Sequence, residues 1–92
     1  MADGINLTPV DPSAVDALVD GFPARLHRCR ERSNLTVPQA STRARLDPGQ
    51  WRKFERGDTE PGMRILLRMQ YALRLETLEP LFDDTSLATL SK

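Results

Sequence analysis

Hydrophobic residues recur at helical spacing along most of this chain and predict five helices. Over residues 22–33, apolar positions form one face of a helix, and arginines occupy several of the other positions. A second stripe predicts a helix over residues 63–73, and a short last helix follows over residues 78–82. No stretch shows the strict alternation of a strand, so the chain is predicted to be all-α. The two longer apolar faces, which we expect to be buried, consist of Phe22, Leu26 and Cys29, and of Met63, Leu66, Leu67, Met69 and Leu73.

Capping residues mark two further short helices in the middle of the chain. Thr36 and Gln39 match a capping box, in which each side chain satisfies the other residue's backbone amide, and predict a helix to about residue 44. Asp47 precedes a proline that fits a first helical turn, which predicts a helix over residues 48–56. Two short helices joined by a tight turn form a helix-turn-helix, whose second helix can lie in the major groove of DNA.

The two ends of the chain are predicted to lie outside this helical domain. Residues 13–19 could form a short helix, but Gly21 and Pro23 are expected to interrupt any continuous helix beyond it. The predicted organisation is an acidic N-terminal extension over residues 1–21, a helical domain over residues 22–82 and a C-terminal tail over residues 83–92.

Composition narrows the class of protein. A chain of 92 residues has room for about one domain, and 39% hydrophobic with 28% charged residues is typical of a compact fold. No apolar run approaches the roughly 18–20 residues of a membrane span, and the acidic N-terminus lacks the basic region of a secretory signal. We therefore expect a cytoplasmic protein that does not contact a membrane.

Residues that could support catalysis or bind a metal are few. The chain has one cysteine, Cys29, and one histidine, His27, so neither a disulfide framework nor a Cys/His metal site is expected. Cys29 lies on an apolar stripe, and His27 is predicted to face outward without an acidic or thiol partner at catalytic spacing. The sequence holds no glycine-rich phosphate loop and no pair of carboxylates suited to acid–base chemistry. These observations predict a protein that is not an enzyme and needs no cofactor.

Charge is distributed unevenly, although the formal net charge is zero. The first 21 residues contain four acidic and no basic side chains, whereas residues 22–57 contain nine basic and three acidic ones. A basic middle between acidic ends indicates an anion-binding surface, but a solvated face with internal salt bridges would have the same composition.

The helix predicted over residues 48–56 has a basic face and an apolar face. At about 100° per residue, Trp51 and Phe54 point to one side of this helix. Trp51 could stack on a base, but its position opposite the arginines favours the core. Arginine and lysine bind phosphates and can also fork onto the acceptors of guanine, while Gly49 would let the backbone approach closely. The opposite, outward face consists of Gly49, Arg52, Lys53 and Arg56.

The stretch from Phe22 to Phe82 resembles the Cro/XRE-type phage-repressor DNA-binding domain. The segment Glu55-Arg56-Gly57 followed by Pro61 matches the E-R-G-x-x-x-P signature of that family, and residues 77–82 resemble its S-L-D-E-L-F ending. The resemblance implies a compact five-helix domain and a sequence-specific transcriptional regulator of bacterial or phage type. Such a regulator, commonly a repressor, binds double-stranded DNA as a dimer.

Several positions depart from the family pattern. Val37 stands where the family has a backbone-contacting glutamine, and Arg45 stands where the turn carries glycine. The first exposed positions of the third helix are Pro48 and Gly49, whose side chains carry no donors. Base-specific readout is therefore expected to fall on Arg52 and Lys53, with Gln50 or Arg45 as further candidates. The residues expected to contact DNA are Thr36, Arg43, Arg45, Gly49, Gln50, Arg52, Lys53 and Arg56.

Core substitutions compensate one another in size. Ala40 and Ala44 are smaller than the aliphatic residues of the family, whereas Trp51 is larger than its usual counterpart, which can conserve total volume. Glu55 lies beside the buried stripe and is expected to bind an arginine such as Arg30.

A second class of function stays open at this point. A protein-binding adaptor, or an antitoxin-like partner, could use the same scaffold with weak DNA readout, since a fold does not determine a function. The dimerising element of a regulator is expected outside the basic segment, either on the apolar side of residues 10–19 or on the last helix with Leu87 and Leu90.

Overall fold

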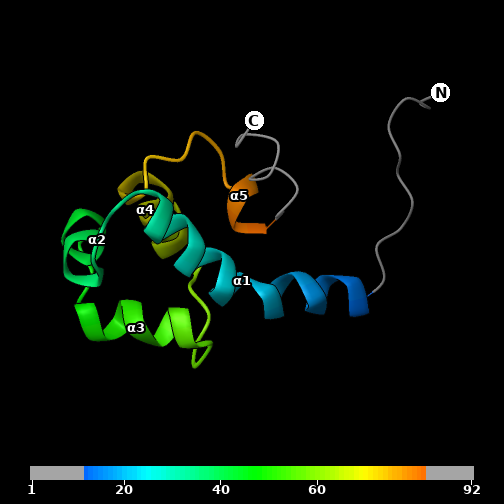
Figure 1. Ribbon diagram of the computed structural model, residues 1–92. Coiled ribbons are helices and arrows are strands. Elements are labelled where there is room, and N and C mark those ends of the chain that lie inside the picture. The colour runs from blue at the N-terminus through cyan, green and yellow to red at the C-terminus, as the bar shows by residue number, and fades with distance from the viewer. Residues whose placement is uncertain (1–11, 83–92) are drawn as a thin grey trace.

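The computed structural model describes residues 12–82 and contains, within that range, five α-helices and no strand. The prediction of an all-α, five-helix domain is therefore confirmed. Residue 10 and the two leucines at 87 and 90, named as candidates for dimerisation, lie outside the described residues. The helices are α1 (Pro12–Arg32), α2 (Val37–Ala44), α3 (Pro48–Arg56), α4 (Met63–Ala72) and α5 (Glu79–Phe82), arranged as in Figure 1.

Helix α1 is one continuous helix of 21 residues, so the predicted interruption at Gly21 and Pro23 is wrong. Proline removes one backbone hydrogen bond from the helix interior, yet α1 continues through Pro23. The Arg25 guanidinium folds back along the helix and donates to the Leu18 carbonyl at 3.2 Å. Gly21 leaves room for it, because a Cβ there would lie 2.6 Å from the Arg25 Nη1 atom.

The caps of α2 and α3 confirm the predicted boundaries. The Thr36 hydroxyl accepts from the Gln39 amide at 3.2 Å, and the Gln39 side-chain oxygen accepts from the Thr36 amide at 2.9 Å. At the start of α3, the Asp47 carboxylate accepts from the Gly49 amide at 2.9 Å. Gly57 ends α3 in the left-handed conformation with φ of 78°. Local sequence therefore determines where both helices begin and end.

The turn between α2 and α3 contains a strained residue. Arg45 has φ of 58° and ψ of 47°, in the left-handed region that the family reserves for glycine. Its conformation lets the Leu46 amide donate to the Ser41 carbonyl at 2.8 Å, which closes the end of α2.

Replacing Arg45 by glycine is expected to raise the free energy of unfolding by about 0.5–1 kcal/mol, because glycine has no Cβ to strain at positive φ. Urea denaturation followed by circular dichroism measures the change. Arg52→Gly is the matched control, since Arg52 lies within α3, and there glycine should lower stability by about 1 kcal/mol. A loss of stability in both variants would contradict the assigned strain.

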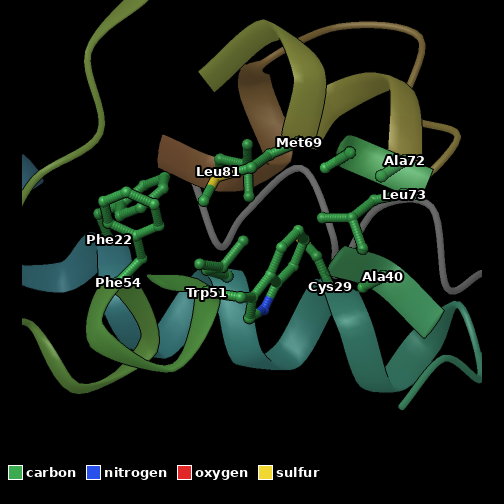
Figure 2. Packing of buried hydrophobic residues seen from close by; sticks show 11 residues of the cluster. Phe22, Cys29, Ala40, Trp51, Phe54, Met69, Ala72, Leu73 and Leu81 are labelled. Atoms are coloured by element: carbon green, nitrogen blue, oxygen red, sulfur yellow. The ribbon is translucent and has the colours of Figure 1, made fainter. Parts of the chain in front are cut away.

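The core lies between the helices and centres on the fully buried Trp51 (Figure 2). Helix α1 packs against α3 and α5, and α2 packs against α3 and α4. The small Ala40 and Ala44 of α2 are both buried, which is consistent with the predicted compensation of volume. Buried hydrophobic residues among those described are Phe22, Leu26, Cys29, Ala40, Ala44, Trp51, Phe54, Met69, Ala72, Leu73 and Leu81.

Helix α4 buries only part of its predicted apolar stripe. Met69 is fully buried as expected, but Met63 is 77% exposed and Leu67 is 47% exposed. The expectation that both side chains belong to the core is therefore wrong. Helix α4 packs mainly on α2, so one side of its wide apolar surface is left uncovered. We call the exposed residues Met63, Leu67 and Tyr71 the α4 apolar stripe.

Candidate nucleic-acid interface

Helix α3 presents its basic residues outward and its rings inward. Trp51 and Phe54 are buried, which confirms the core assignment of the tryptophan. Gln50 is also exposed, next to the outward face. In Figure 1, α3 runs along one edge of the molecule, with α1 on its inner side. The outward residues Gly49, Arg52, Lys53 and Arg56 are all exposed, and we call them the α3 cationic face.

The remaining predicted contact residues lie around this face or apart from it. Thr36 is exposed at the start of α2, and Arg45 is exposed in the turn that leads into α3. Arg56 forms an exposed ion pair with Asp58, with 2.8 Å between Nε and Oδ2. Arg43 is directed to α4 instead, where its Nε donates to the Ala72 carbonyl at 2.7 Å. Of the eight residues predicted to contact DNA, five therefore lie on α3, whereas the Arg43 side chain is bound to α4.

Behind the cationic face, one carboxylate fixes α3 to α1. Glu55 accepts from Arg30 Nε at 2.6 Å, from Trp51 Nε1 at 2.6 Å and, through its other oxygen, from Arg30 Nη2 at 3.1 Å. The side chains of Glu55 and Arg30 are only 10% and 13% exposed. Arg30 also donates to the Leu35 carbonyl at 2.8 Å, which ties the loop after α1 to the same network. We call Arg30, Trp51, Glu55 and His27 the Glu55 network.

Within the Glu55 network, Glu55 and Arg30 shift each other's pKa. Burial acts to raise the pKa of the Glu55 carboxyl, but hydrogen bonds from Arg30, His27 and Trp51 outweigh it and hold that pKa below its usual value. The hydrogen bond to Glu55 raises the pKa of the Arg30 guanidinium. Glu55 is therefore ionised and paired at neutral pH, and the predicted contact with Arg30 is confirmed.

The prediction that His27 has no acidic partner is wrong. Its Nδ1 lies 2.9 Å from a Glu55 oxygen, and its Nε2 lies 3.1 Å from a Glu31 oxygen. The contact between His27 and Glu31 could be predicted from the sequence, because residues four apart lie on the same face of a helix. The Glu55 contact joins residues 28 apart and depends on how α1 packs on α3. His27 therefore belongs to the network that braces α3.

A family model for the helix-turn-helix domain matches residues 21–80, which span all of α2, α3 and α4. The chain belongs to the helix-turn-helix domain family. This match agrees with the resemblance to the Cro/XRE type, and it indicates a DNA-binding regulator in general. Neither a curated protein nor a solved structure matches the chain.

Two departures from the family pattern have local structural reasons in this helix-turn-helix domain. A Cβ on Gly49 would lie 2.9 Å from an Asp47 carboxylate oxygen, so glycine also accommodates the cap of α3. Val37 is half-buried and packs against the core, which explains an apolar residue at the start of α2. Sequence reasoning missed both, because each depends on a contact across a helix end.

Residues 12–82 contain neither a metal site nor a membrane span. No group of His, Cys, Asp or Glu within residues 12–82 is arranged to hold a metal ion. None of the helices in that range combines the length and apolarity that crossing a membrane requires.

Proposed function

We propose that this helix-turn-helix protein is a sequence-specific transcriptional regulator of bacterial or phage type, whose α3 lies in the major groove of DNA. The observation that carries the proposal is the α3 cationic face, which is exposed while Trp51 and Phe54 on the same helix are buried. The Glu55 network ties α3 to α1 through Arg30 and His27, which favours one orientation of the face. Such preorganisation lowers the entropic cost of binding.

The exposed residues divide into two roles. Arg52 and Lys53 lie in the middle of the outward face of α3, where a side chain inserted into the groove reaches base edges, with Gln50 beside them. We assign contacts with phosphates to three other exposed residues: Arg56 at the end of α3, Thr36 before α2 and Arg45 in the turn before α3. Sequence preference therefore depends on a small number of side chains.

A single helix-turn-helix domain covers one half-site, so we propose that the regulator acts as a homodimer in the bacterial cytoplasm. A dimer of this kind binds half-sites about one helical turn, or roughly 34 Å, apart. Its operator would be a palindrome, and repression would follow where that operator overlaps a promoter.

Retention of a random duplex library at two salt concentrations tests this function. We expect a palindromic motif to be enriched and total binding to fall steeply with salt, because phosphate contacts release counterions. Arg52→Ala should weaken the preferred sequence by about 10- to 100-fold and relax its preference, whereas Arg56→Ala should weaken all sequences alike.

Arg28→Ala is the matched control, because Arg28 is an exposed arginine of α1 and does not belong to the α3 cationic face. It should leave both the motif and the affinity unchanged. Retention of all sequences alike by the wild-type protein at the lower salt concentration would contradict sequence-specific readout.

A second candidate is a protein-binding adaptor on the same scaffold. It is favoured by the α4 apolar stripe, and by Arg43 and Arg56, which are already engaged with Ala72 and Asp58. Purification of the tagged protein from its native cell separates the two functions. One stoichiometric protein partner recovered without DNA would favour the adaptor.

A further inference from the structure

The first turns of α1 project beyond the rest of the helical domain. The first buried residue of this helix is Phe22, and all of residues 12–21 are exposed or half-buried. Figure 1 shows these turns, the blue end of α1, extending past the other helices. The hydrogen bonds that tie α1 to α3 come from His27 and Arg30, in the second half of the helix. We call residues 12–20 the α1 projecting turns.

The projecting turns carry an apolar edge on one side and acidic residues on the other. Val15 is 47% exposed and Leu18 is 41% exposed, although at about 100° per residue both continue the stripe that is buried at Phe22. Asp16 and Asp20 lie about 100–140° around the helix from Val15, so they face away from this edge. The projecting turns contain no lysine or arginine, so their charge disfavours contact with phosphates. The exposed edge is therefore suited to a protein surface and not to DNA.

A pocket of about 240 Å³ continues the apolar edge toward the domain. Val19 of α1 lines it, and Leu66 and Phe82 contribute apolar surface from α4 and α5. Helical spacing puts Pro12 and Val19 on the same side of the edge, about 20° apart. In an antiparallel pair related by a two-fold axis, that side is shared by both helices, so the first turn of one helix runs over the pocket of the other. Edge and pocket are thus complementary to a second copy of themselves, which is what a two-fold contact requires.

We propose that the α1 projecting turns of two copies pack against each other in an antiparallel pair. Val15 of each copy contacts Leu18 of the other, and Pro12 covers the pocket beside Val19 of the other copy. The aspartates stay in water, and α3, which is tied to the second half of α1, keeps its cationic face exposed. Nine residues from each copy form a small contact, in the class below about 1,200 Å² that gives weak, reversible association. This inference rests on the proposed function, because it identifies the dimer contact that a palindromic operator needs.

Polar substitution of the apolar edge tests whether it holds the dimer together. Val15→Gln with Leu18→Gln removes the edge but keeps residues that favour a helix, and its self-association should be at least about tenfold weaker than that of the wild type. Met63→Gln with Leu67→Gln is the matched control, because it makes the same change on the α4 apolar stripe, where both side chains are also exposed. The control should associate like the wild type. Sedimentation equilibrium of the full chain without DNA measures each case, and circular dichroism verifies that the helices are intact.

Disulfide formation between single-cysteine substitutions tests the direction of the pair. In an antiparallel pair, position 15 of one copy lies against position 18 of the other, so a mixture of Val15→Cys and Leu18→Cys should form a mixed disulfide in a glutathione buffer. Each variant alone should form far less disulfide-linked dimer, since a disulfide tolerates only a narrow range of Cβ separations. A parallel pair would give the reverse result. The wild type serves as the blank, because its Cys29 is buried.

Three outcomes would overturn the proposed contact: a wild-type chain that stays monomeric at the highest concentration at which it is soluble, self-association that Val15→Gln with Leu18→Gln retains, and disulfides that form within each cysteine variant but not between the two.

A variant of the α3 cationic face separates the dimer contact from DNA binding. Arg52→Glu with Lys53→Glu alters exposed residues of α3 and should dimerise like the wild type while losing retention of duplex DNA. If the wild type fails to bind DNA but the dimer depends on Val15 and Leu18, the contact holds and the proposed function fails. If DNA is bound but self-association does not depend on these two residues, the dimer contact alone is overturned.

Discussion

Replacing Trp51 by alanine is expected to lower the free energy of unfolding by about 3–5 kcal/mol, a large share of the stability of a small domain. Trp51 is fully buried on α3, which packs against α1 and α2, so its loss leaves a cavity in the core (Figure 2). The small Ala40 and Ala44 on the facing helix cannot fill that space. The loss also removes the indole donor to Glu55 at 2.6 Å.

Urea denaturation followed by circular dichroism measures this loss without relying on tryptophan fluorescence. Tyr71→Ala is the matched control, because it also removes an aromatic ring, but from a side chain that is 71% exposed. We expect this control to change stability by less than about 1 kcal/mol. Trp51→Phe keeps most of the ring and removes the N–H group, so its cost should fall between the two. Equal losses for Trp51→Ala and Tyr71→Ala would contradict the inward orientation of the tryptophan.

Local sequence was sufficient to predict the helix-turn-helix itself. Thr36, Asp47 and Gly57 act on backbone groups within four residues of themselves, and such short-range chemistry is the same before and after folding. The two faces of α3 were predictable for a similar reason, since a helix of known bounds fixes which side chains share a side. The position of the α3 cationic face along the chain, and the side of the helix on which it lies, could therefore be predicted from the sequence.

Features that depend on contacts between helices were not predictable. Proline at position 23 argues against a helix on local grounds, yet the Arg25 side chain supports that turn in α1. The apolar pattern of α4 does not show which side of the helix packs against another helix, and the prediction that Met63 belongs to the core is wrong for that reason. His27 and Glu55 meet only because α1 packs on α3.

Replacing Glu55 by glutamine is expected to lower the free energy of unfolding by about 3 kcal/mol at neutral pH. The substitution keeps the shape of the side chain but removes the charge that compensates the buried Arg30 guanidinium. An amide also presents one acceptor oxygen in place of two, so the donors from Arg30, Trp51 and His27 can no longer all be satisfied. Because the donors from Arg30 and His27 join α1 to α3, retention of duplex DNA by the α3 cationic face should weaken together with stability.

The cost of Glu55→Gln should depend on pH in a defined direction. Since the folded-state pKa of Glu55 is held below its usual value of 4.5, its ionised form contributes stability that is fully present above that value. This contribution is lost as the pH falls through the lower, folded-state pKa. The difference in unfolding free energy between wild type and Glu55→Gln should therefore be constant near neutral pH and shrink on acidification below about 4.5.

Glu31→Gln is the matched control for this substitution, because Glu31 also contacts His27 but its side chain is 61% exposed. An exposed pair of this kind contributes about 0–1 kcal/mol, so the control should follow the wild type across the whole pH range. Urea denaturation at a series of pH values, with all three proteins measured together, isolates Glu55 from the other carboxylates that titrate in the same window. A difference that stayed constant down to the acid transition would show that the Glu55 charge does not stabilise the contact between α1 and α3.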